Sequence, residues 1–127
     1  MEPVLHDRSD PAGAEQRSLR RRLINAIHEL TGRYQYGLGE WYRGRGQLDE
    51  AVAAFEAAEH WEAAHMGPKH PYVVAAIIAR AATLAQLGRT EEACRQYLRA
   101  LHLIEETVGG EHPTAQQIER YLNVNCG

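Results

Sequence analysis

GQLDEAVAAFEAAEHWEAAHMGPKHP at residues 46–71 returns in altered form as GRTEEACRQYLRALHLIEETVGGEHP at residues 88–113, 42 residues later. Glycine, glutamate, alanine, histidine and proline coincide at eight aligned positions, and Phe55 is matched by the similar ring of Tyr97. A repeat of this length is typical of proteins built from stacked helix hairpins, because one hairpin cannot bury its apolar face alone. This pair of stretches therefore decides the fold class.

Apolar residues elsewhere in the chain fall at helical spacing, and no segment alternates with the two-residue period of a strand. We therefore predict an all-α protein of antiparallel helix hairpins. Residues 1–14 have no apolar period and are predicted to be a mobile tail. The remainder, 15–127, is predicted to be a single helical domain. Its predicted parts are an extra helix at 15–31, repeat one at 33–67 (with helices at 33–45 and 48–66), repeat two at 70–109 and a C-terminal helix at 113–124.

Glycine and proline mark the ends of the predicted helices. Gly32 is expected to end the extra helix, and glycines after the later helices are expected to end those. His70-Pro71 and His112-Pro113 are expected to open helices, since proline suits the first helical turn and the preceding histidine can cap it.

Small residues are expected to let the helices approach closely, because the chain contains a single phenylalanine. Gly37 and Gly39 lie inside helix 33–45, where each glycine costs roughly 0.5–1 kcal/mol relative to alanine. The expected reason is a second helix lying against the backbone at both positions. Ala51 and Ala93 are predicted to be packed so tightly that a tryptophan at either would unfold the domain.

Composition excludes several classes of protein. The net charge of −3 gives no general argument for nucleic acid, and no apolar stretch approaches the roughly 20 residues that cross a membrane. The N-terminus lacks the pattern of a secretory signal. Cys94 and Cys126 have no CxxC spacing and are interpreted as free thiols in a reducing compartment. We expect a cytoplasmic protein without cofactor, membrane contact or nucleic-acid partner.

The repeat resembles the tetratricopeptide repeat (TPR), in the 42-residue form found in kinesin light chains. In that family, Leu-Gly and Tyr lie on the first helix of a repeat, Gly at the turn, and small, aromatic and small residues on the second helix. In the first copy these positions are Leu38, Gly39, Tyr42, Gly46, Ala51, Phe55 and Ala58. In the second copy they are Ala81, Leu84, Gly88, Ala93, Tyr97 and Ala100, with Arg80 in place of the expected leucine. The resemblance covers roughly residues 33–124 and implies a right-handed α-solenoid of two repeats plus flanking helices.

The resemblance also implies a function. TPR proteins of this kind are non-enzymatic adaptors or scaffolds that hold a peptide or partner helix in a concave groove, lined by the first helix of each repeat. Carried over position by position, the groove residues are Arg33, Tyr36, Glu40, Arg43, Ala75, Ile78, Ala82, Ala85 and Gln86, with Gln117 and Arg120 added by the last helix. A basic, aromatic end beside an apolar patch fits an acidic protein segment with apolar anchors. Kinesin-light-chain-like repeats carry an asparagine pair in this groove, where this chain has Tyr36-Gly37 and Ile78-Ala79.

Other functions stay open from the sequence. A small-molecule-binding or enzymatic subunit could use a groove around Tyr36, Trp41, Tyr42 and a histidine, although no catalytic motif occurs in the chain. The basic run 17–22 could bind nucleic acid, but such a run is more often the solvated face of a helix. His60 and His65 lack the i,i+4 spacing of two ligands on one helix face, so no metal site is expected.

Two repeats are fewer than the roughly three that a solenoid needs for stability. Either the flanking helices act as caps or two chains stack. Tyr121, Leu122, Val124 and Cys126 at the C-terminal end favour a homodimer. Whether helix 15–31 fills the groove is left open by the sequence.

Overall fold

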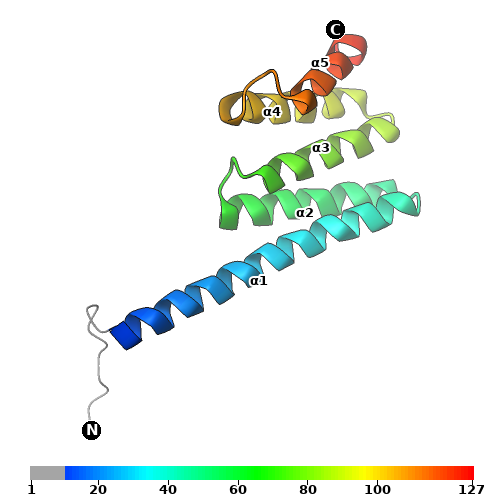
Figure 1. Cartoon of the computed structure of the whole chain (residues 1–127). Helices are drawn as coiled ribbons and strands as arrows, with labels where there is room; N and C mark the ends of the chain where they lie inside the picture. The colour runs from blue at the N-terminus through cyan, green and yellow to red at the C-terminus, as the bar shows by residue number, and fades with distance from the viewer. Residues whose placement is uncertain (1–10) are drawn as a thin grey trace.

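The computed structural model describes residues 11–127, and these form helices and no strand (Figure 1). The helices are α1 Pro11–Gly44, α2 Leu48–Met66, α3 Pro71–Gln86, α4 Thr90–Thr107 and α5 Pro113–Asn125. The main contacts join helices that are consecutive in the chain, so the molecule is an open stack rather than a closed bundle. The predicted all-α fold of stacked helix hairpins is confirmed.

The N-terminal region differs from the prediction because α1 runs without interruption through Gly32. The expected helices 15–31 and 33–45 are therefore one helix, and residues 11–14 of the expected tail belong to it. Residues 1–10 of that tail lie outside the described part of the chain. A Cβ on Gly32 would come within 2.6 Å of the Glu62 side chain. Gly32 therefore allows α2 to approach α1 closely and does not end the helix.

The glycine turns recur at half the length of the 42-residue sequence repeat. Gly46, Gly67, Gly88 and Gly109 are the described residues with positive φ, and consecutive members of the set are 21 residues apart. Each follows the end of a helix by one or two residues. The sequence repeat of 42 residues therefore corresponds to two helices and two glycine turns.

The predicted histidine caps at α3 and α5 are confirmed. His70 Nδ1 accepts a hydrogen bond from the Tyr72 backbone N–H at 3.1 Å, and His112 Nδ1 accepts one from the Thr114 N–H at 3.2 Å. These bonds satisfy an N–H group that the first turn of a helix leaves without an intrahelical partner. Each His-Pro pair thus fixes the start of a helix.

The first hairpin packs around Phe55, whose side chain is fully buried between α1 and α3. A Cβ on Gly39 would meet the Phe55 ring at 2.5 Å, so this glycine is required by the close approach of α2. The same expectation is wrong for Gly37, where an added Cβ has no neighbour within 4 Å. The difference follows from helix geometry, because residues two apart point to different sides of α1.

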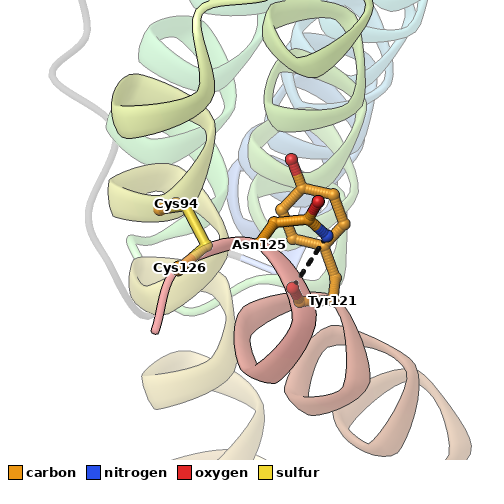
Figure 2. Close-up of a disulfide and its surroundings, with 4 residues drawn as sticks. All are labelled: Cys94, Tyr121, Asn125 and Cys126. Carbon is orange, nitrogen blue, oxygen red and sulfur yellow. Dashed lines mark hydrogen bonds between the residues drawn. A yellow bond between two sulfur atoms is a disulfide. The ribbon is translucent and has the colours of Figure 1, made fainter.

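Cys94 and Cys126 form a disulfide, which overturns the interpretation of both as free thiols. Their Cα atoms are 6.0 Å apart, and the bond joins the first half of α4 to the residue that follows α5 (Figure 2). Beside it, Asn125 Nδ2 donates a hydrogen bond to the Tyr121 carbonyl at 3.0 Å. The separation of 32 residues in sequence hides this proximity, which arises only when α5 folds back along α4.

Candidate interaction surface

An apolar hollow lies where the first half of α3 meets the end of α4 and the start of α5. Its volume is about 450 Å³, and its walls are formed by Lys69, Pro71, Val74, Ala75, Ile78, Ile104, Thr107, Val108, His112 and Thr114. Residues of the two His-Pro junctions line this one hollow, because the junctions lie one sequence repeat apart. Equivalent segments of the two repeats therefore form parts of the wall of a single hollow.

Three polar side chains in the wall of the hollow are already engaged within the chain. Lys69 Nζ forms an ion pair with Glu106 at 3.1 Å, and the Thr107 hydroxyl donates to the Leu103 carbonyl at 2.7 Å. His112 Nδ1 is used in capping α5. What the hollow offers a ligand is mainly hydrocarbon, which suits an apolar side chain better than a charged one.

A cluster of charged and aromatic side chains joins α1, α2 and α3. The Arg33 guanidinium lies 3.8 Å from the ring centre of Tyr72 and 4.8 Å from that of Tyr36. Its Nη2 donates to Glu62 Oε1 at 3.1 Å, and Glu62 is only 1% exposed. An ion pair at such a place is retained only with good geometry, because removing either charge leaves the other without compensation.

The tyrosines of this cluster have raised pKa values. The Tyr72 hydroxyl donates to Glu29 Oε1 at 3.1 Å, and this hydrogen bond is the main cause that raises the pKa of Tyr72. Burial is the main cause that raises the pKa of Tyr36, and Glu40 adds to the effect. The Tyr72 hydroxyl therefore keeps its proton, and its hydrogen bond to Glu29, to a higher pH than an ordinary tyrosine would.

The predicted groove residues do not all line the apolar hollow. Ala75 and Ile78 line the apolar hollow. Arg33 and Tyr36 contact each other in the cluster described above. The remaining predicted residues do not line the hollow: Glu40, Arg43, Ala82, Ala85, Gln86, Gln117 and Arg120.

Both arginines of the expected basic end already have acidic neighbours. Arg33 is paired with Glu62, and Arg43 Nη2 lies 3.3 Å from Glu40 Oε2. The positive charge offered to a ligand is therefore smaller than the residue types suggest. Glu62 could have been found from the sequence, because it continues the seam of Ala51, Phe55 and Ala58 at helical spacing.

Two further contacts were not predicted. Tyr72 covers Arg33, although it comes directly after Pro71 and carries no sequence signal for that role. Trp61 Nε1 donates to the His28 carbonyl at 2.8 Å, and its ring stacks on His65 with centroids 4.1 Å apart. Trp61 therefore fastens the end of α2 to the middle of α1.

The aromatic residues considered for a small molecule do not share one pocket. Tyr36 packs edge-on against Phe55 at 5.3 Å, inside the first hairpin. Trp41 lies in a separate shallow hollow with Tyr34, Gly37 and Leu38, and no histidine is in its wall. Within residues 11–127, no three His, Cys, Asp or Glu side chains lie close enough together to hold a metal ion. No helix in this part of the chain has the length and apolar character of a membrane span.

Comparison with known families agrees with this architecture. Residues 73–114 match the family model described as tetratricopeptide repeat. No curated protein matches the chain. The matched segment begins in α3, covers α4 and ends in the first turn of α5, so it is one helix hairpin with the start of the next. Residues 73–114 of the chain therefore form a tetratricopeptide repeat.

Proposed function

We propose that this protein is a non-enzymatic adaptor that binds a segment of another protein in the groove beside α3. Tetratricopeptide repeats generally mediate protein–protein interactions. The observation that supports a specific place is the apolar hollow of about 450 Å³, which contains two of the predicted groove residues, Ala75 and Ile78. The ligand is a peptide or helix that inserts an apolar side chain there.

The preferred ligand is less acidic than the sequence suggested. Arg33 and Arg43 are each held by a carboxylate of the same chain, so acidic residues of a partner would compete with Glu62 and Glu40. We therefore propose apolar anchors as the main determinant, with acidic residues as a secondary one.

The proposal is tested by selecting peptides from a displayed random library against the purified chain. We expect enriched peptides to share an apolar anchor and to bind more weakly, by about tenfold or more, to an Ile78→Glu variant, because a buried anchor contributes a large share of binding free energy. Leu98→Glu is the matched control, since it replaces an exposed apolar residue of α4 that lies outside both the hollow and the predicted groove. Equal binding by both variants would place the ligand elsewhere.

We also propose a cytoplasmic location, and the Cys94–Cys126 disulfide provides a way to test it. Disulfides persist in oxidising compartments and are rare in a reducing cytosol. If the chain works in the cytosol, Cys94 and Cys126 are thiols there. Trapping free thiols in the cells that make the protein, followed by mass spectrometry of the two cysteines, distinguishes the two compartments.

A further inference from the structure

The outer face of α1 carries an apolar stripe that no described residue covers. Seven large apolar side chains on this helix each expose between 44% and 68% of their surface. They are Leu19, Leu23, Ile24, Ile27, Leu30, Tyr34 and Trp41. We call this set the outer stripe. Contiguous apolar surface of this kind on a folded protein marks an interaction site.

The outer stripe faces away from the rest of the molecule. Leu23 and Trp41 are each nine residues from Gly32, which is about two and a half turns of helix and therefore the opposite side. Side chains of α2 lie directly against α1 at Gly32 and Gly39, where an added Cβ would meet Glu62 and Phe55. The groove residues Arg33 and Tyr36 lie on a third side, so a partner on the stripe leaves the proposed peptide site free.

The spacing of the outer stripe is that of a helix-pairing seam. Leu23, Ile27, Leu30, Tyr34 and Trp41 follow at intervals of four, three, four and seven residues, and Gly37 fills the remaining position of the heptad pattern. This alternation places apolar residues along one line of contact with a second helix. Gly37 leaves a hollow of about 400 Å³ between Tyr34, Leu38 and Trp41, into which a side chain of that helix would fit.

Most of the N-terminal half of α1 is exposed. Residues 14–27 are all exposed, and α2 is fastened to α1 at His28 through Trp61. In Figure 1 this half of α1 extends beyond the end of α2. A free helix shorter than about 12–15 residues is only marginally stable, and longer ones gain most of their stability from packing. This half of α1 is therefore expected to have a packing partner.

We propose that the partner is a second copy of this chain, with the two α1 helices antiparallel and crossing near Leu30. A two-fold axis at this residue places Leu23 of one copy opposite the Gly37 hollow of the other, and Leu19 opposite Trp41. The same surface then serves both copies, as a two-fold interface requires. This dimer is independent of the proposed peptide groove.

Charge favours the antiparallel orientation over the parallel one. Arg20, Arg21 and Arg22 are exposed near the start of α1. Near its end Glu40 is paired with Arg43, Arg45 lies over the Trp41 ring at 4.7 Å, and the acidic first turn of α2 follows with Asp49 and Glu50. The C-terminal end of a helix also carries a partial negative charge. Parallel pairing would place these three arginines of the two copies side by side, whereas antiparallel pairing separates them and brings each set toward the end of α1 where Asp49 and Glu50 lie.

The available area is close to what a stable dimer needs. At the exposed fractions given above, the seven side chains of the outer stripe present roughly 700 Å² per chain, if each has an area typical of a large apolar residue. A standard protein–protein interface buries about 800 Å² per partner. Flanking aliphatic parts of polar residues supply the difference.

The first test is the mass of the full chain in solution by sedimentation equilibrium. We expect twice the 14.3 kDa of one chain, and the single-chain mass for an Ile27→Glu/Leu30→Glu variant. Both residues are exposed, so hydrogen exchange at the buried backbone amides of α2, α3 and α4 should be unchanged. A native chain that sediments as a monomer across micromolar concentrations would overturn the proposal.

Val124→Glu is the matched control, because Val124 is 82% exposed at the opposite end of the molecule. It also tests the C-terminal homodimer that the sequence favoured. Dimer lost in this variant and kept in the Ile27→Glu/Leu30→Glu variant would move the interface to α5 and overturn the assignment to α1.

Crosslinking tests the orientation, since the native cysteines are already paired with each other. In an antiparallel dimer, a mixture of Leu23→Cys and Gly37→Cys chains should form an intermolecular disulfide, and neither variant alone should do so efficiently. A parallel dimer would give the reverse result, with each variant crosslinking to itself, and would overturn the antiparallel arrangement.

Discussion

Single residues in this chain have roles that depend on which side of a helix they occupy. Arg80 is an example, since it replaces the leucine expected at its repeat position. Its guanidinium lies 3.7 Å from both Glu56 and Glu59 of α2, and Glu59 also pairs with Arg99 of α4 at 2.8 Å. The departure from the repeat pattern therefore exchanges an apolar contact for a charged network that links three helices.

The two glycines inside α1 provide a test of close approach. Gly39→Ala should destabilise the chain by about 1–3 kcal/mol, because the new methyl group meets the buried Phe55 ring. Gly37→Ala should stabilise it by roughly 0.5–1 kcal/mol, because alanine is the better helix former and has free space there. Denaturant unfolding of dilute protein measures both. Equal effects of the two substitutions would contradict the packing of Phe55 on Gly39.

The loss of stability at acidic pH should depend in part on Glu92. Its carboxylate accepts two hydrogen bonds from Arg89, at 2.9 and 2.6 Å, and this contact lowers the pKa of Glu92 below its usual 4.5. A lowered folded-state pKa stabilises the fold above pH 4.5, and that contribution is lost as the pH falls through the folded value. Glu92→Gln should therefore flatten the fall in melting temperature below this pH, as followed by thermal unfolding over a series of acidic buffers.

At the scale of elements, the turns were predictable and the length of α1 was not. The His-Pro starts and the turn glycines carry local backbone requirements, which the sequence states directly. Gly32 looked like a stop for the same reason, but its cause is the neighbouring Glu62 of α2. A glycine required by tertiary contact has the same appearance in a sequence as one required by a turn. The Cys94–Cys126 bond was missed because it too depends on how helices stack.

The Cys94–Cys126 disulfide should stabilise the packing of α5 on the rest of the molecule. α5 packs on the rest of the molecule through few buried side chains, chiefly Ala115 and Ile118. Closing a loop of this length stabilises a fold by roughly 2–4 kcal/mol. We expect reduction to speed hydrogen exchange at the backbone amides of α5, with those of α3 little changed. Equal protection of α5 with and without reductant would show that its apolar contacts suffice.

At the scale of the whole molecule, stability comes from the contacts between successive helices. Ala51 and Ala93 are both 0% exposed and occupy equivalent positions in the two repeats. Tryptophan at either should abolish cooperative unfolding, because no void can accept the ring. Ala53→Trp is the control, since Ala53 is exposed on the same helix as Ala51. A cooperative thermal transition at the native temperature in Ala51→Trp would contradict the packing.

The candidate site was only partly predictable for the same reason. Repeat position alone identified Ala75 and Ile78, which line the hollow. It could not show that Arg33 is already paired with Glu62, because that pair depends on how α1 is rotated against α2. The Arg43–Glu40 pair lies three residues apart on α1, so its spacing was visible in the sequence. Leu23, Ile27 and Leu30 recur at helical spacing in the sequence, but their exposure appears only once α2 is seen to cover the opposite side of α1.

The glycine turns have a consequence for chirality. Gly46 and Gly88 have φ of 75° and 80°, which is a conformation that natural L-residues adopt at a cost of about 1–2 kcal/mol. A mirror-image residue prefers that same conformation. D-alanine introduced at either exposed turn by chemical synthesis should therefore raise stability by about 0.4–1 kcal/mol, because it restricts only the unfolded chain. L-alanine at the same position should lower it, so the handedness of one methyl group would decide the sign.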